Sequence, residues 1–181
     1  SLNLDDRYIN LVEEGVDLAI RMGRLSDSSL GARFLGLNPW VVVATPEYLE
    51  KNGTPSIPSD LSKHIALIYS SVQGDHRWQF TGRDGSNKSI QVSGLLYSNN
   101  LSTLLAATRN HLGIAALPWY VAYSSVQSRH LKPLLADWSL PAQEIHAVFS
   151  SPRLVPTKVS MLIDWLAGQF RGNWWTQEIG S

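Results

Sequence analysis

The stretch Trp40–Leu49, WVVVATPEYL, places a short and entirely apolar run directly before a helix start. An apolar run of this length, without alternating polar residues, is typical of a strand covered on both faces. Thr45-Pro46-Glu47 then offers a capping hydroxyl, a proline at the first helical position and an acid in the first turn. Asn52-Gly53 supplies a stop signal. We therefore predict a strand over Trp40–Ala44 and a helix that ends near Asn52.

The same two kinds of segment alternate along the rest of the chain. Further apolar runs predict buried strands at Asp17–Met22, Ile65–Ser70, Ile114–Leu117 and Ile145–Ser150. Apolar residues at helical spacing predict one helix over Leu101–Leu112, stopped by Gly113, and another behind Pro156 that continues to Phe170. Strands that alternate with helices indicate an α/β fold with open, mostly parallel sheets.

Two segments depart from this alternation. His76–Thr81 and Ser89–Leu96 are strand-like and flank the turn sequence Arg83–Ser86, which predicts an antiparallel hairpin. Ser1–Asp5 reads as a strand with no element before it. Because an α/β lobe rarely opens in this way, we expect an upstream strand and helix to precede it.

Composition narrows the classes of function. The 181 residues are 44% hydrophobic and 17% charged, and 15 basic residues balance 15 acidic ones. A DNA-binding face normally carries a basic surplus, so we expect any DNA contact to lie outside this chain. The absence of cysteine excludes disulfides, thiolate metal sites and a cysteine nucleophile. With no signal peptide and no apolar run near the roughly 20 residues of a membrane span, we expect a cytoplasmic location.

Catalytic patterns are missing from the sequence. The five histidines do not show the spacing of a helical metal pair, and no nucleophile elbow or glycine-rich phosphate loop is present. Glu13 and Glu14 sit side by side and read as a solvated surface rather than an acid–base pair. We expect no catalytic residue, no metal and no cofactor.

Six blocks of the sequence match motifs of one known family, in that family's order. The blocks are Tyr8–Gly23, Trp40–Leu49, Thr54–His64, Leu112–Pro118, Leu131–Trp138 and His146–Val159. The first block, YINLVEEGVDLAIRMG, is similar to the signature "dLveeGvDlaiR.G", and the others are similar to a strand–helix junction, a "tP..p.DL..H" connection, a "GlGia.LP" strand and later motifs. Together they resemble the effector-binding domain of LysR-type transcriptional regulators.

The resemblance implies a periplasmic-binding-protein-like fold of two Rossmann-like lobes joined by two crossover strands. Lobe I would hold residues 1–41 and 149–181, and lobe II residues 42–148, with crossings near Val42–Ala44 and Ile145–Phe149. It also implies that the winged helix-turn-helix, the linker helix and the domain's first strand and helix lie outside this chain. A small anionic effector, such as a carboxylate or an aromatic acid, would bind between the lobes. The parent would act as a homodimer or homotetramer.

Candidate effector-binding residues lie where buried strands end and helices begin, because ligands of open α/β sheets settle there. Arg21 is either an effector anchor, with Met22 and Gly23 beside it, or an arginine turned outward to pair with an acid. Asn99 and Asn100 either help a helix N-terminus to hold a carboxylate or simply cap it. Tyr69, Ser70 and Ser71 lie at a third strand end, where their hydroxyls either orient a ligand or form a polar turn. Pro118 and Phe149 lie at analogous strand ends and complete the set.

Aromatic residues add two further hypotheses. Trp119, directly after Pro118, either stacks on an aromatic effector or fills a core or an interface. Trp165, Trp174 and Trp175 are candidates for a subunit interface, with core packing for Trp165 and a loose tail for the other two as the alternative. As a whole, the chain is expected to sense a small molecule. Alternatives are a solute-binding protein of the same fold and an enzyme on that fold with a bound tetrapyrrole, which would need a cysteine attachment point.

Overall fold

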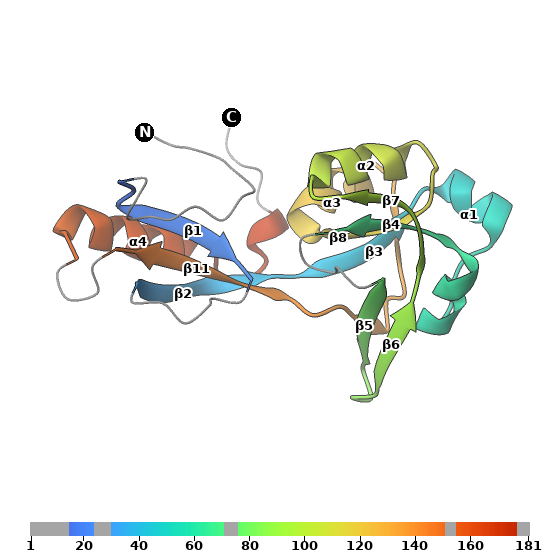
Figure 1. The fold of residues 1–181 in the computed structure, drawn as a ribbon, viewed down its shortest axis with the longest axis horizontal. Coiled ribbons are helices and arrows are strands. Elements are labelled where there is room, and N and C mark those ends of the chain that lie inside the picture. Colours follow the sequence, from blue (N-terminus) through green and yellow to red (C-terminus); the bar gives the residue numbers. More distant parts are fainter. Residues whose placement is uncertain (1–14, 24–29, 71–75, 151–154, 177–181) are drawn as a thin grey trace. The chain divides into compact units, whose positions relative to one another are not determined.

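The computed structural model describes residues 15–23, 30–70, 76–150 and 155–176. The chain divides into two compact units (Figure 1). Unit 1 combines the described residues up to Asn38 with those from Gln143 onward, and unit 2 runs from Pro39 to Ala142. No helix in the described ranges is both long and apolar enough to cross a membrane.

Unit 1 is a sheet of three described strands covered by one helix. The strands are β1 (Leu18–Met22), β2 (Gly31–Asn38) and β11 (Gln143–Phe149), in the order β1-β11-β2, and both pairings are antiparallel. Helix α4 (Thr157–Gln169) packs Val159 and Ile163 against Leu35, Ile145 and Ala147. The short 3-10 helix η2 (Trp174–Thr176) follows.

Unit 2 is built on a five-stranded sheet in the order β7-β4-β8-β3-β9. Its strands are β3 (Trp40–Ala44), β4 (Ile65–Tyr69), β7 (Ser93–Ser98), β8 (Ile114–Pro118) and β9 (Lys132–Leu134). Its helices are α1 (Pro46–Asn52), η1 (Pro58–Lys63), α2 (Leu101–Arg109) and α3 (Trp119–Gln127). A second, smaller sheet in the order β10-β5-β6 contains β5 (Arg77–Gly82), β6 (Asn87–Gln91) and β10 (Trp138–Ser139).

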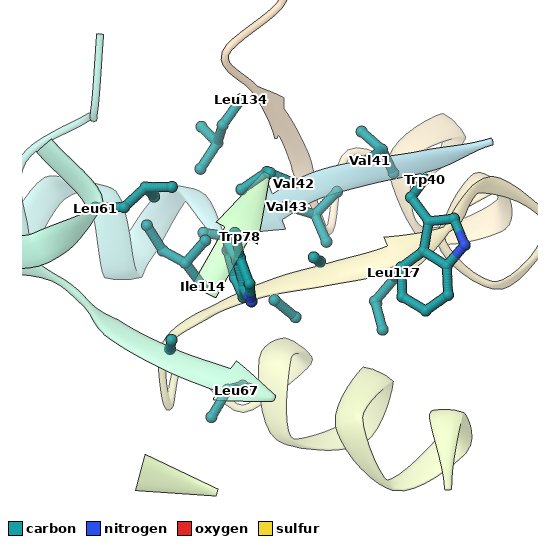
Figure 2. Close-up of a cluster of buried hydrophobic side chains, with 14 of the residues drawn as sticks. Trp40, Val41, Val42, Val43, Leu61, Leu67, Trp78, Ile114, Leu117 and Leu134 are labelled. Atoms are coloured by element: carbon teal, nitrogen blue, oxygen red, sulfur yellow. The ribbon is translucent and has the colours of Figure 1, made fainter. Parts of the chain in front are cut away.

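The larger core lies in unit 2, around the central strands of the five-stranded sheet. Val43 and Leu117 are 0% exposed, and Leu67 from β4 lies in the same cluster (Figure 2). Trp78 from the smaller sheet enters the same cluster, so the two sheets share one core. Burial of this kind is the main favourable contribution to folding, at about 25 cal/mol per Å² of apolar surface.

The strands predicted from apolar runs are present, but their directions differ from the prediction. Within the described ranges only β4 with β7 and β4 with β8 pair in parallel, whereas the remaining pairings are antiparallel. The α/β fold class is confirmed, but among the described strands the expectation of mostly parallel sheets was wrong. A continuous apolar run reports burial on both faces and not strand direction: β3 is buried throughout, yet it runs antiparallel to β8 and β9.

The predicted hairpin is correct only in its first half. β5 and β6 pair antiparallel around the expected turn. The segment predicted as one strand over Ser89–Leu96 breaks at Val92, and its second part becomes β7, which pairs in parallel with β4 in the other sheet. At this change of partner the Val92 side chain is buried, and the Val92 backbone amide donates a hydrogen bond to the His76 carbonyl at 2.7 Å.

The boundaries between the two units also fall earlier than the resemblance implied. The chain passes between units at Asn38–Pro39 and again at Ala142–Gln143. All of β3 belongs to the unit 2 sheet, and β11 pairs along its length with β1 or β2, so neither strand is divided between units. The strand suggested for Ser1–Asp5 lies outside the described residues.

Candidate functional site

The carboxyl end of the unit 2 sheet brings together the features expected of an effector site. β4 runs parallel to both β7 and β8, so these three strands end on the same side. Two residues separate β7 from helix α2, and α3 begins directly after β8. Because β3 runs antiparallel to β8, its first residue, Trp40, pairs with Pro118 on this same side. Two helix N-termini and four strand ends therefore share one side of the sheet.

Backbone and hydroxyl groups fix the connection from β7 to α2. The Ser70 amide donates to the Ser98 carbonyl (3.0 Å), which ties the end of β4 to the end of β7. The Ser98 hydroxyl accepts from the Asn100 amide at 3.0 Å. Asn100 Oδ1 in turn accepts from the Thr103 amide (2.9 Å) and hydroxyl (3.2 Å). Asn100 is thus the N-cap of α2, and its side-chain oxygen is already occupied by capping.

The start of α3 differs from that of α2 because its N-cap residue is Pro118, and no side chain caps the helix. The Trp119 amide donates to the Pro39 carbonyl at 2.9 Å. An α-helix leaves its first amides without intrahelical acceptors and carries partial positive charge there. The N-termini of α2 and α3 can therefore both contribute donors to an anion without any basic side chain.

Aromatic rings line the same end of the sheet. Trp40 and Tyr69 are buried, and their ring centroids lie 5.8 Å apart at a tilt of 42°. Trp119, which follows β8, is half-buried. Asn99 and Ser70 are exposed, and within the described ranges neither side chain forms a hydrogen bond. This end of the sheet thus combines apolar ring surface with uncommitted polar side chains.

Five of the predicted site residues come together here, namely Tyr69, Ser70, Asn99, Asn100 and Pro118. Ser71 lies outside the described residues. Ser98 and the α3 start were not anticipated from the sequence. The proline at the end of an apolar strand, followed by the apolar residues Trp119 and Val121, is the signal that could have located α3.

The other described candidates belong to unit 1, and the structure separates Phe149 from Arg21, Met22 and Gly23. Arg21 and Met22 end β1, and Gly23 follows, with its amide donating to the Glu144 carbonyl at 2.9 Å. Phe149 pairs with Leu18, at the opposite end of β1. The idea that Phe149 lies at an analogous strand end assumed parallel strands, whereas β11 is antiparallel to β1. The Phe149 ring instead packs on the unit 1 core, against Gly31.

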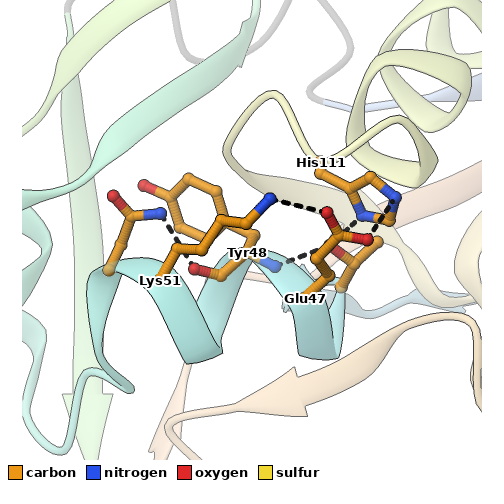
Figure 3. Close-up of polar contacts among 6 residues, drawn as sticks. Glu47, Tyr48, Lys51 and His111 are labelled. Carbon is orange, nitrogen blue, oxygen red and sulfur yellow. Dashed lines mark hydrogen bonds and ion pairs between the residues drawn. The ribbon is translucent and has the colours of Figure 1, made fainter.

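A polar network lies at the opposite end of the unit 2 sheet, where β3 ends and α1 begins (Figure 3). His111 Nδ1 lies 2.8 Å from the Thr45 hydroxyl, and its Nε2 lies 3.2 Å from a Glu47 carboxylate oxygen. Lys51 donates to the same carboxylate at 2.7 Å. The hydrogen bond from Lys51, and then the charge of His111, lower the pKa of Glu47. The network joins the first turn of α1 to the connection between α2 and β8.

This order of hydroxyl, imidazole and carboxylate resembles that of a nucleophilic triad, but the surroundings differ. Thr45 is 2% exposed, and its hydroxyl already accepts from the Tyr48 amide at 3.2 Å, so a substrate cannot reach it. His111 adopts a φ of +61°, which is unfavourable for a residue with a Cβ, and its two side-chain contacts hold it there. The arrangement therefore has a structural role, because it holds the first turn of α1 against the connection between α2 and β8. Within the described ranges, no three His, Asp or Glu residues gather into a metal site.

Trp165 and Trp174 also have defined positions in unit 1. Trp165 is 60% exposed on α4, beside the exposed side chains of Met161 and Leu162, so the core-packing alternative does not hold for it. Trp174 is half-buried, donates to the Leu37 carbonyl at 2.7 Å and lies edge-on to Phe170. Trp174 is therefore not part of a loose tail.

Comparisons with known proteins agree with this architecture. The family model "LysR substrate binding domain" matches residues 1–171. An uncharacterised HTH-type transcriptional regulator of Haemophilus influenzae is 33% identical over 159 residues, which cover 88% of this chain and 55% of the relative. The HTH-type transcriptional activator AaeR of Escherichia coli K12 is 32% identical, covering 89% of this chain and 52% of AaeR.

Solved structures give the same result. The regulatory domain of CrgA, a LysR-type transcriptional regulator from Neisseria meningitidis, is 30% identical and superposes with a TM-score of 0.75 over 91% of this chain and 80% of that one. The chain spans only about half the length of the curated relatives that it matches. Because the family model covers nearly the whole sequence, this chain belongs to the LysR substrate-binding domain family.

Proposed function

We propose that this chain is the effector-sensing part of a transcription regulator and that it binds a small organic anion at the carboxyl end of the unit 2 sheet. One observation carries the proposal: the ends of β4, β7 and β8 and the starts of α2 and α3 lie on one side of one sheet. Ligands of open α/β sheets bind in this position, where helix N-termini supply donors.

The chemistry of these residues favours a carboxylate that carries an aromatic ring. The amides at the helix starts favour the carboxylate, and the exposed Asn99 and Ser70 side chains can orient it. The half-buried Trp119 offers a ring face for stacking. Arg21 stays a separate proposal as an effector contact, because a guanidinium forms paired hydrogen bonds with a carboxylate.

Differential affinity is the physical basis of the proposed sensing. An effector that binds one conformation of the chain more tightly than another shifts the population toward that conformation, and only by this difference in affinity. A solute-binding protein of the same fold is the weaker alternative, since the relatives are HTH-type transcription regulators.

A binding experiment on this chain tests the proposed site. Thermal-shift and calorimetric titrations would use benzoate, phenylacetate and succinate as probes. At about a hundredfold excess over Kd, a bound probe should stabilise the fold by about 2.7 kcal/mol. Arg21→Ala and Asn99→Ala should each weaken binding about tenfold, as expected when one hydrogen bond to a charged group is lost.

Controls separate loss of binding from loss of fold. Arg171→Ala removes an exposed arginine of unit 1 and should leave Kd unchanged. Circular dichroism should show the same secondary structure for all variants. A Kd that is the same in Arg21→Ala and the parent sequence would remove Arg21 from the site. Failure of all three acids to bind would contradict an anionic effector.

The wider assembly extends the same proposal. In the whole regulator, an N-terminal DNA-binding domain would read the promoter, and this chain would report effector binding to it through a cytoplasmic homodimer or homotetramer. The exposed Met161, Leu162 and Trp165 side chains on α4 support an apolar contact with another subunit. No catalytic step is part of this function.

A further inference from the structure

The chain passes between the two units through two connecting segments, one that begins at Pro39 and one that ends at Ala142. Both segments join unit 1 at neighbouring residues. β2 ends at Asn38 and β11 begins at Gln143, and these two residues are paired in the unit 1 sheet. Pro39 follows Asn38 immediately, and Pro141 lies just before β11. Because proline fixes φ, any bending of these short segments is concentrated in the few residues around the Asn38–Gln143 pair.

A buried amide connects the two segments at this point. Asn38 Nδ2 donates to Gln143 Oε1 at 3.1 Å and also lies 3.5 Å from the sulfur of Met22. Asn38 is 0% exposed, and its Oδ1 has no hydrogen-bond partner within the described ranges. The side chain thus makes one bond that holds the segments together and leaves one buried oxygen unsatisfied.

The hydrogen bond and the unsatisfied oxygen have opposite effects on the free energy of separating the two segments. The Nδ2 bond forms only while the two segments stay in register. The unsatisfied oxygen is penalised as long as it is buried, by an amount at least as large as the net gain from a neutral hydrogen bond, and it would be hydrated if the segments parted. A side chain of this kind favours neither state strongly, which is the property of an element that an effector can bias.

We infer that Asn38 and Gln143 form a clasp where both connecting segments leave unit 1, and that opening and closing of this clasp governs how freely the two units reorient. The link to sensing rests on the proposed function, but the clasp itself can be tested without an effector.

Substitutions with leucine predict opposite effects at the two positions. Asn38→Leu removes both the bond and the unsatisfied oxygen and would expose an apolar group on opening, so it should favour the closed clasp. Gln143→Leu removes the acceptor of this bond and leaves the Asn38 amide without this partner, so it should favour opening. The double variant Asn38→Leu/Gln143→Leu should behave like Asn38→Leu, because no buried amide is left.

Single-molecule energy transfer measures the motion directly. The chain contains no cysteine, so Gln169→Cys on α4 and Glu50→Cys on α1, both exposed, place one dye in each unit. The distribution of transfer efficiency should broaden with Gln143→Leu and narrow with Asn38→Leu and the double variant. Hydrogen exchange at the Gly23 amide, which bonds Glu144 next to the clasp, should become about tenfold faster with Gln143→Leu, as for one lost hydrogen bond.

Two outcomes would overturn the inference. Unchanged distributions in folded variants would show that the pair does not limit motion, and broadening in both single variants would show that Asn38 acts only through packing. If Asn38→Leu does not fold, Gln143→Leu is compared with Gln143→Glu, since the glutamate retains an acceptor for Asn38. The distribution of transfer efficiency should then broaden with Gln143→Leu and not with Gln143→Glu, and equal broadening in both would overturn the inference. Calorimetric binding of the acid probes is a separate measurement, so failure of the clasp leaves the proposed effector site standing.

Discussion

The imidazole of His64 is 7% exposed, at the start of β4 and beside the Tyr48 ring. Burial is the largest influence on this group and lowers its pKa, while the charge of Asp60 acts in the opposite direction. The sequence placed His64 within a family motif but gave no reason for a buried imidazole. Its surroundings come from α1 and η1, which no local pattern around residue 64 describes.

The lowered pKa of His64 predicts a loss of stability in mild acid. Below the unfolded-state pKa of 6.5 the unfolded chain takes up a proton that the folded chain does not. The contribution of His64 is therefore complete above that pH and is lost as the pH falls through the folded-state pKa. Chemical denaturation between pH 8 and 5 should show a smaller decline in unfolding free energy for His64→Gln than for the parent sequence. His130→Gln, at an exposed position, should keep the parent's decline, and an unchanged decline in His64→Gln would contradict this account.

At the scale of elements, the sequence predicted strands and helices better than it predicted their partners. Apolar runs located β1, β3, β4, β8 and β11, and capping residues located α1 and α2, because burial and capping are local properties. β2 was missed, since GARFLGLN mixes glycine and charge with its apolar residues. The carboxyl-end rule correctly grouped five of the predicted residues on one side of the unit 2 sheet, because β4, β7 and β8 are parallel. The rule failed for Phe149 because β11 is antiparallel to its neighbours.

The α2 start predicts different roles for two adjacent asparagines. Asn100 Oδ1 caps the helix, so Asn100→Ala should lower the unfolding free energy by about 1 kcal/mol and Tm by about 2–4 °C. Asn99 is exposed and makes no such bond, so Asn99→Ala should change the unfolding free energy by less than about 0.5 kcal/mol. Thermal unfolding followed by circular dichroism measures both. Equal losses in the two variants would show that Asn100 is not the functional cap.

At the scale of the whole molecule, neither composition nor local pattern could supply the division into units. The crossings at Asn38–Pro39 and Ala142–Gln143 are set by which sheet each strand completes, a tertiary property. The family blocks implied two lobes, but with boundaries inside β3 and β11. Net charge is a whole-molecule property that the sequence gives directly, and the 15 basic residues balance the 15 acidic ones.

This balance predicts that the isolated chain does not retard promoter DNA on a gel at physiological salt. Non-specific affinity for DNA arises mainly from cations that neutralise phosphates and release counterions, and it decreases steeply as salt rises. Several of the chain's described basic side chains are already paired with acids, among them Arg33 with Asp164, Lys51 with Glu47 and Lys158 with Asp17. A full-length LysR-type regulator with its own promoter fragment serves as the positive control on the same gel. Retardation by this chain that disappears as salt is raised would show that its surface binds phosphates. The proposal that a separate domain of the regulator binds DNA would then be wrong.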